Sequence, residues 1–415
     1  MRLVSDANLG MLELTLSWEH ADMKCRERYL ARKVNFWRDV FPKGLREALD
    51  GRGPGESATM TYAPGEALPG KNPRNAVHAR KDRAEPLRVA GRTVPYRLGG
   101  FYPRGRFGGA GFFPGDARPA RIVEEDARGY LLDCDHPLAG KGFSLTAEIL
   151  ELAPKASDTG GRLYDWLEEI ATYGPGMQAP LAPEHARLGP EGYRRLDASQ
   201  DAFFYAAPRL VAHIDRRADD ILTGLYAGHL RPGMRVLDLM SGPHSHLPAD
   251  MDLAVAGIGM NAEEMRRNPA LSAHLEHDLN ANPALPFPDG AFDAVLCSLS
   301  VEYLLDPVAV FAECARVLEP GGVMLTSFSN RWFPEKCVTG WMDLHEFERL
   351  GLVAEHYRRA GAFGELETVS ARNWFRPLDD PHIRQTLTSD PVYMVKAVKT
   401  AGGGGQGRDR GLDQQ

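Results

Sequence analysis

Two polar side chains follow short apolar stretches near the middle of the chain, and their types could serve ligand binding. Asp238 follows Val236 and Leu237, and Asn261 follows the apolar run 253–258. If both runs are neighbouring strands of an open α/β sheet in a βαβ-like unit, a carboxylate and an amide emerge at one sheet edge. Ligands of such sheets bind at the carboxyl ends of the strands. The sequence therefore predicts a ligand site on Asp238 and Asn261.

The turn between these stretches contains two histidines, His244 and His246. Imidazoles bind metals and can act as general bases near neutral pH. One turn with two histidines and no third ligand is weak support for a metal, so we predict no metal site. The histidines are assigned to shaping the loop or packing beside a ligand, and a role as base stays open.

A series of ordered motifs surrounds the predicted site. These are VLDLMSG at 236–242, GIGMN at 257–261, HDLN at 277–280, FDAVLCSLSVEYL at 292–304 and RVLEPGGVMLTSF at 316–328. Together they resemble the class I S-adenosylmethionine-dependent methyltransferases over residues 234 to about 363. The resemblance implies a Rossmann-like, doubly wound α/β domain with S-adenosyl-L-methionine as cofactor. It also departs from the family, because the first loop is poor in glycine and Asn261 replaces an acidic residue.

The resemblance also implies which residues hold the cofactor. Asp238 would face its methionine end, Gly242 would let the loop approach closely, Asn261 would meet the ribose, and Asp278 and Leu279 would flank the adenine. The full set of expected cofactor residues is Asp238, Met240, Gly242, Gly259, Asn261, Asp278, Leu279, Ser298 and Ser300.

Catalytic residues are harder to predict, because methyl transfer depends more on positioning than on an acid or base. A helix opened by Pro208 would bring Tyr205 and His213 towards the pocket, with a surface or packing role for His213 equally open. Asn330 follows the fifth strand of the predicted sheet, where an acceptor would enter. The methyl acceptor, a protein or a small molecule, stays open.

The first part of the chain has a strand pattern. Leu12, Leu14 and Leu16 alternate within 11–20, a short helix and a strand follow in 41–64, and 121–135 and 142–152 are two further strand candidates. GLREALDGRGPGE and DHPLAGKGFSLTAEILEL resemble FKBP-type peptidyl-prolyl isomerases of the SlyD class. The resemblance implies a mainly β domain with an insert in its flap and polypeptide binding or chaperone activity.

The same resemblance implies a prolyl pocket made by Trp18, Phe41, Leu45 and Leu145. The backbone N–H that would hold the substrate carbonyl falls on Pro42, which has none to donate. We therefore expect weak isomerase activity or a fold retained for polypeptide binding. A shift of one residue, with Phe41 or Lys43 supplying the N–H, is the open alternative.

Residues 71–120 hold 11 Lys and Arg against 3 Asp and Glu, with six interleaved aromatic residues. The basic and aromatic residues could bind an unfolded or acidic client or a nucleic acid backbone. We prefer the interpretation that the aromatic residues form the core of a small subdomain. A nucleic acid partner is not expected.

Length and charge favour two domains, since residues 1–150 hold 24 basic and 19 acidic side chains whereas the whole chain carries a net charge of −7. We expect an FKBP-like domain at 1–153 with an insert at 67–120, a linker with a helix at 154–205, a methyltransferase domain at 206–400 and a disordered tail at 401–415. No signal peptide, membrane span, disulfide or zinc spacing is expected, and the predicted location is cytoplasmic. The alternative is a non-enzymatic chaperone or adaptor in which both domains have degenerated.

Overall fold

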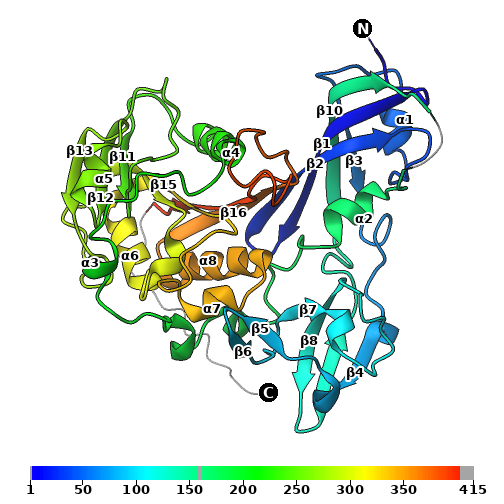
Figure 1. The fold of residues 1–415 in the computed structure, drawn as a ribbon, viewed down its shortest axis with the longest axis horizontal. Helices are drawn as coiled ribbons and strands as arrows, with labels where there is room; N and C mark the ends of the chain where they lie inside the picture. Colours follow the sequence, from blue (N-terminus) through cyan, green and yellow to red (C-terminus); the bar gives the residue numbers. More distant parts are fainter. Residues whose placement is uncertain (1, 158–160, 402–415) are drawn as a thin grey trace.

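One sheet of eleven strands runs through the whole protein in this computed structural model, which describes residues 2–157 and 161–401. The strand order is β13-β12-β11-β14-β15-β17-β16-β2-β1-β10-β3, so strands from both halves of the chain share it (Figure 1). The part built from the C-terminal half contains β11 (Arg235–Leu239), β12 (Ala254–Gly259), β13 (Ala273–Glu276), β14 (Phe292–Ser298), β15 (Leu318–Phe328), β16 (Phe363–Arg372) and β17 (Val392–Lys399).

Helices cover both faces of this C-terminal part. Strand residues alternate between the faces, so Val236 packs in the apolar cluster of α4 whereas Leu237 packs in the cluster of α6 and α8. α4 lies on the opposite side of the sheet from α6 and α8 (Figure 1). β11 to β15 are parallel and β17 is antiparallel, which confirms the predicted doubly wound sheet. The helices are α3 (Asp201–Phe204), α4 (Arg216–Ala227), α5 (Ala262–Arg266), α6 (Pro307–Val317), α7 (Thr339–Met342) and α8 (Glu346–Ala360).

The N-terminal half supplies the antiparallel end of the sheet. Leu12, Leu14 and Leu16 are buried on one face of β1, as their alternation predicts. β16 pairs in parallel with β2, and this pairing joins the halves. The elements are β1 (Asn8–His20), β2 (Met23–Asn35), α1 (Leu45–Leu49), β3 (Ser57–Tyr62), β10 (Phe143–Pro154) and α2 (Trp166–Ala171).

A separate four-stranded sheet, ordered β4-β9-β8-β7, lies between β3 and β10 in the sequence. Tyr102, Phe107 and Tyr130 are buried at its centre, which confirms the core role of the aromatic residues there, although Phe113 is 76% exposed. The strands of this part are β4 (Ala76–Arg80), β5 (Leu87–Val89), β6 (Arg92–Val94), β7 (Phe101–Pro103), β8 (Pro119–Glu125) and β9 (Gly129–Asp133).

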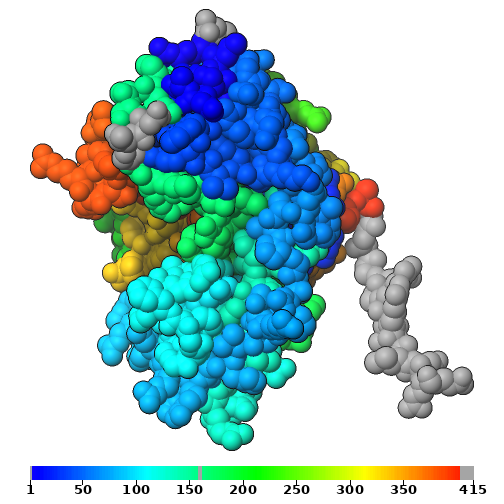
Figure 2. All heavy atoms as spheres, turned by 90° about the vertical axis from the view of Figure 1, so that its right-hand side faces the viewer, coloured from blue at the N-terminus to red at the C-terminus, as the bar shows by residue number. Residues whose placement is uncertain are grey.

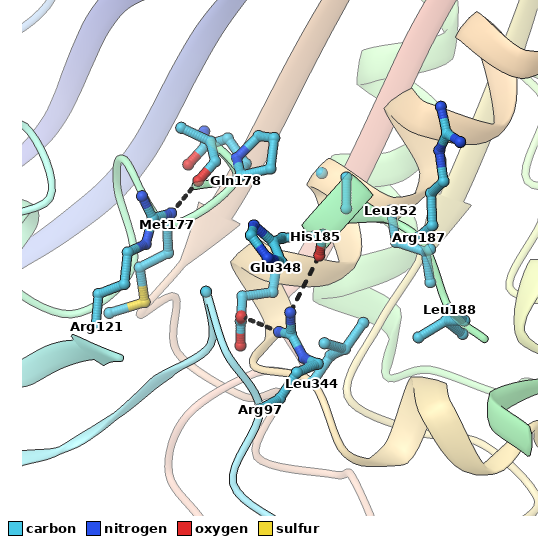
Figure 3. Close-up of a pocket in the computed structure, with 15 residues that line it drawn as sticks. Arg97, Arg121, Met177, Gln178, His185, Arg187, Leu188, Leu344, Glu348 and Leu352 are labelled. Atoms are coloured by element: carbon cyan, nitrogen blue, oxygen red, sulfur yellow. Dashed lines mark hydrogen bonds and ion pairs between the residues drawn. The ribbon is translucent and has the colours of Figure 1, made fainter. Parts of the chain in front are cut away.

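This inserted sheet docks on the C-terminal half through arginines. Arg97 bonds to Glu348 of α8 at 2.5 Å and to the carbonyl of His185 at 3.1 Å (Figure 3). Arg92 pairs with Asp343 at 2.7 Å. In the space-filling view the inserted sheet and the N-terminal strands form two lobes, with part of the linker between them (Figure 2). The linker contains the 3-10 turns η4 (Pro183–Ala186) and η5 (Pro190–Tyr193).

Two local predictions differ from the structure. Residues 121–135 form the two strands β8 and β9 instead of one, because the chain turns at 126–128. The helix expected from Pro208 begins only at Arg216, because the Asp215 side chain accepts hydrogen bonds from Arg217 and Ala218 and caps the helix there.

The connection between β11 and β12 also differs from the expected βαβ-like unit. Residues 240–253 are described throughout and contain no helix, because Gly242, the two prolines Pro243 and Pro248, and the serines favour turns there. The five cysteines are buried and free, as expected. Across the described residues, helices are too short or too polar to cross a membrane. All but the first residue of the predicted tail lie outside the described residues.

Candidate functional site

A cavity of about 560 Å³ opens where β11, β12 and β14 end. Its position matches the edge at which open α/β sheets bind ligands. All nine residues predicted to hold the cofactor line it, and so do Tyr205 and His213. The cofactor contacts themselves stay predictions. The nine residues are Asp238, Met240, Gly242, Gly259, Asn261, Asp278, Leu279, Ser298 and Ser300.

Asp238 lies near the end of β11 and is almost completely buried. Its carboxylate accepts hydrogen bonds from the hydroxyls of Ser241 at 2.6 Å and Ser245 at 2.7 Å. Burial raises the pKa of Asp238 to about 6, although both hydroxyl groups favour the ionised form. The side chain therefore anchors the loop that forms one wall of the cavity.

That loop passes very close to the end of β12. The amide of Ser241 donates to the carbonyl of Ile258 at 2.7 Å, and a Cβ atom at Gly259 would lie 2.3 Å from the carbonyl oxygen of Ser241. Only glycine fits there unless the loop moves. At Gly242 a Cβ atom would meet only Glu264, at 3.5 Å, so the space beside Gly242 faces the cavity.

Asn261 has a structural role that the sequence prediction missed. Its side-chain oxygen accepts hydrogen bonds from the amides of Glu263 and Glu264 and caps α5, and its nitrogen donates to the Tyr205 carbonyl at 2.9 Å. β12 ends at Gly259, so the strand-end position belongs to that glycine and not to Asn261. Assigning Asn261 to the strand end was wrong, and its contact with the ribose stays a prediction.

The remaining predicted cofactor residues line other walls. Asp278 follows β13 and accepts from the amide of Asn280 at 2.9 Å, while Leu279 is buried. The Ser298 hydroxyl at the end of β14 bonds to the buried Tyr226 hydroxyl at 2.8 Å. Ser300 lies directly before the turn η6 (Val301–Tyr303) as its cap residue. A hydrogen bond from Tyr226 of α4 thus holds this part of the cavity wall.

Residues 205–213 cover the cavity as an irregular segment. Among the described residues, the Tyr205 hydroxyl and Nη1 of Arg209 are buried without a hydrogen-bond partner, and both residues line the cavity. Buried polar atoms normally find partners, so these two fit a polar ligand in the cavity. Burial lowers the pKa of His213, which packs against Phe333 with ring centroids 5.8 Å apart.

Asn330 lies elsewhere. It lines a second cavity of about 340 Å³ beside Arg372, Arg376 and Asp390, whereas Arg331, Trp332 and Phe333 line the first cavity. Asn330 is thus absent from the lining of the first cavity, and its role in orienting an acceptor stays a prediction. The strand β15 ends at Phe328, and the chain then turns so that the next residues face different cavities.

Several residues of the site escaped sequence reasoning. Glu264 lines the cavity and accepts a hydrogen bond from the amide of Arg209 at 2.6 Å. Its position in the first turn of α5, close after β12, was the sequence feature that could have indicated a place in the site. Asp219 of α4 bonds to both His244 and His246, at 3.0 and 2.6 Å. No local pattern links Asp219 to those histidines, because 25 residues and a strand separate them.

The residues of the predicted prolyl pocket pack in the apolar core. Trp18, Leu45 and Leu145 are at most 4% exposed, and Phe41 stacks on Phe36 with ring centroids 6.1 Å apart. Trp18, Leu45 and Leu145 belong to one large apolar cluster, and Phe41 packs against it. A prolyl-binding role for these four residues stays a prediction.

Comparisons with known proteins support the methyltransferase resemblance of the C-terminal half. The family described as "Methyltransferase domain" matches residues 245–326, from the first loop to β15. The chain is 36% identical over 159 residues to a demethylmenaquinone methyltransferase of Beutenbergia cavernae, covering 36% of this chain and 60% of that protein. It is 28% identical to a ubiquinone/menaquinone biosynthesis C-methyltransferase of Shewanella piezotolerans, covering 32% and 62%.

The chain thus spans less than two thirds of the length of these two relatives. A solved structure of a putative methyltransferase from Bacillus halodurans is 15% identical, with a TM-score of 0.31, and covers 43% of this chain and 99% of that one. The sequence matches, together with the cavity at the ends of the parallel strands, lead to one conclusion. Residues 245–326 match a methyltransferase domain, and the matches indicate S-adenosylmethionine as the cofactor.

Proposed function

We propose that this protein transfers a methyl group from S-adenosylmethionine to a small aromatic acceptor. The observation that carries the proposal is the cavity of about 560 Å³ with two unpartnered polar atoms, the Tyr205 hydroxyl and Arg209 Nη1, buried at its wall. When bound, the cofactor supplies an electrophilic methyl group on a sulfonium. The task of the protein is then to hold both reactants in line and exclude water.

The cofactor half of the cavity is assigned to the residues on the strand ends. The loop held by Asp238 would receive the methionine end, and Asp278 with Leu279 would receive the adenine. Glu264 and Arg209 border the same space and supply one acidic and one basic group. Gly259 supplies no side chain, so we assign no carboxylate at the end of β12 to the ribose.

The acceptor half is assigned to the aromatic wall. Tyr303, Trp332 and Phe333 line the cavity near the segment 205–213, and planar rings stack well on such side chains. The two relatives named above are called a demethylmenaquinone methyltransferase and a ubiquinone/menaquinone biosynthesis C-methyltransferase, and one more is called a ubiquinone biosynthesis O-methyltransferase from Xanthomonas campestris. His213, whose pKa is lowered by burial, is neutral at pH 7 and suited to accept a proton from an acceptor hydroxyl.

Calorimetric titration of the full chain with S-adenosylmethionine and S-adenosylhomocysteine tests the cofactor assignment. We expect one molecule bound per chain, with affinity lost in an Arg209→Ala/Tyr205→Phe double variant. A panel of hydroxylated aromatic compounds, followed by mass spectrometry for one added methyl group, tests the acceptor class. Binding of neither cofactor form would contradict the proposal and favour the non-enzymatic adaptor.

For the N-terminal half we propose polypeptide binding with weak prolyl isomerase activity. The four strands β2, β1, β10 and β3 with α1, and the inserted sheet between β3 and β10, support this assignment. Trp37, at 57% exposure, and Val40, at 44%, offer apolar surface beside Phe41 and Pro42. Client binding at this surface would use these exposed side chains rather than the buried Trp18.

A refolding assay limited by proline isomerisation tests this second assignment. We expect little acceleration by the wild-type chain and a gain in Pro42→Ala, which restores a backbone N–H at that position. Trp37→Ser should weaken binding of an unfolded client protein, measured by suppression of its aggregation. Equal behaviour of wild type and both variants would contradict the proposal.

A further inference from the structure

Three metal-binding side chains converge at the rim of the cavity. Asp219 comes from α4, and His244 and His246 come from the loop after β11. Nε2 of His244 lies 3.0 Å from one carboxylate oxygen of Asp219, and Nδ1 of His246 lies 2.6 Å from the other. All three ligand atoms lie within 4.8 Å of one another. No single segment of the sequence contains this set.

Hydrogen bonds hold the loop after β11 in place around His246. His246 is 4% exposed and its backbone has φ of 56°, a left-handed conformation that is unfavourable for a residue with a Cβ atom. Its carbonyl accepts from Thr223 of α4 at 3.1 Å. The preceding Ser245 is fixed between Asp238 and the side-chain amide of Asn268, each at 2.7 Å. The imidazole is therefore positioned from both sides before any ligand arrives.

The spacing of the three donors suits a metal ion. A divalent ion about 2.0–2.2 Å from each nitrogen and oxygen separates tetrahedral ligands by roughly 3.3 Å. The donor atoms already lie close to such distances, so only small side-chain movements would be needed. Two imidazoles and one carboxylate favour Zn²⁺, Co²⁺, Fe²⁺ or Ni²⁺ over Ca²⁺ and Mg²⁺, which prefer oxygen ligands.

The protein leaves room for a further ligand on the cavity side. His244 and His246 both line the cavity, whereas Asp219 approaches them from α4. A general base made of an aspartate and a histidine needs only one imidazole. Here two imidazoles point at one carboxylate, and this arrangement is typical of a metal site. Three convergent donors on one side and open space on the other describe a catalytic rather than a structural metal centre.

We propose that Asp219, His244 and His246 bind one divalent transition metal ion whose open coordination positions face the cavity. An oxygen atom of the methyl acceptor would complete its coordination. This last assignment rests on the proposed methyltransferase function, whereas binding of the metal does not. The acceptor would then be an aromatic compound with a hydroxyl or carbonyl group that can reach the metal.

Binding of Co²⁺ to the full chain tests the proposal, because bound Co²⁺ can be followed by its visible absorption. After chelator treatment and dialysis, we expect one Co²⁺ or Zn²⁺ per chain and a higher midpoint of thermal unfolding with the metal present. Asp219→Asn, His244→Gln and His246→Gln should each weaken metal binding by about 100-fold or more. The control is His274→Gln, which changes an exposed histidine on β13 and should bind metal like wild type.

The outcomes separate this proposal from the proposed function. Absence of stoichiometric metal binding by the wild-type chain, or equal loss in His274→Gln, would overturn the metal site. Metal binding that the three variants abolish supports it, even if calorimetry shows no binding of S-adenosylmethionine. An acceptor that changes the Co²⁺ spectrum of the wild-type chain supports the oxygen ligand, and an acceptor that is methylated without changing it overturns that part.

Discussion

The two ends of the eleven-stranded sheet use similar strands for different purposes. At the C-terminal end, β11, β12 and β14 stop beside a cavity of about 560 Å³. At the N-terminal end, β1 and β10 cover their inner face with side chains, and Leu16 and Leu145 are fully buried. At the C-terminal end, the space between the loops that follow the strands forms a site. At the N-terminal end, apolar side chains fill the sheet face and stabilise the fold.

Two buried aspartates show the same difference in detail. Asp39, at the N-terminal end, accepts from the amide of Asn35 at 2.8 Å and from the Trp166 indole at 3.1 Å, so it ties α2 to the sheet. Asp238 accepts from two serine hydroxyls and borders the cavity. Both carboxylates organise a turn, but only Asp238 does so around space that a ligand can fill.

The largest expected effect concerns the join between the two ends. Glu27 of β2 is fully buried and pairs with Arg372 of β16 at 2.7 Å. Arg372→Ala leaves a buried carboxylate without its cation and should lower the free energy of unfolding by about 3–5 kcal/mol. Chemical unfolding followed by tryptophan fluorescence measures the loss.

The double variant Glu27→Gln/Arg372→Leu is the matched control, because it removes both charges together. We expect it to recover most of the stability, since burial already raises the pKa of Glu27 and makes its ionised form costly. If Arg372→Ala unfolds only the N-terminal strands and leaves the C-terminal sheet intact, the two ends are independent units and the comparison above becomes one between domains.

The next effect is the pH dependence that Asp238 contributes at the cavity end. Burial raises the pKa of Asp238 from 3.8 to about 6, so the unfolded chain releases this proton at lower pH than the folded protein. The contribution of Asp238 to stability should therefore fall as the pH rises from about 4 to 6, by roughly 3 kcal/mol. Asp238→Asn should remove this fall. Parallel stability curves for wild type and variant between pH 4 and 7 would contradict the raised pKa.

A third test compares ligand binding by the two aspartate variants. Asp238→Ala should weaken binding of S-adenosylhomocysteine by about 100-fold, or about 2.7 kcal/mol, because the loop of Ser241 and Ser245 loses its anchor. Asp39→Ala should lower the thermal unfolding midpoint and leave that affinity unchanged at a temperature where the variant is folded. Calorimetry measures both affinities. Equal losses would mean that the ligand site depends on the whole sheet.

Sequence reasoning located the cavity because its signals are local. The apolar runs before Asp238 and Asn261 indicated two strands, and the ends of parallel strands meet at one edge of a sheet. The alternation of Leu12, Leu14 and Leu16 predicted β1 for the same reason, since a period of two needs no distant partner. These parts of the fold follow from neighbours in the sequence.

Other features depended on contacts that no local pattern contains. Asp219 meets His244 and His246 only because α4 packs beside the first loop, so the sequence indicated two histidines without a third ligand. Asn330 lines the second cavity because the turn after β15 decides which cavity each residue faces. The parallel pairing of β2 with β16 joins segments more than 300 residues apart, so two separate domains were expected where one sheet forms.

The smallest expected effect decides the role of Asn261. As the cap of α5 it should contribute about 1 kcal/mol, so Asn261→Ala should lower the free energy of unfolding by that amount. The variant Asn261→Asp should keep the helix cap. A carboxylate also accepts hydrogen bonds from the amides of Glu263 and Glu264, and a negative charge is favoured at the start of a helix. The aspartate variant cannot donate to the Tyr205 carbonyl as the amide of Asn261 does, so it should hold the segment 205–213 less firmly and should not strengthen the binding of S-adenosylhomocysteine. A role in holding the ribose makes the opposite prediction, since a carboxylate binds hydroxyls more strongly than an amide does. A tenfold gain in affinity with unchanged stability would therefore assign Asn261 to the ligand and not to the helix.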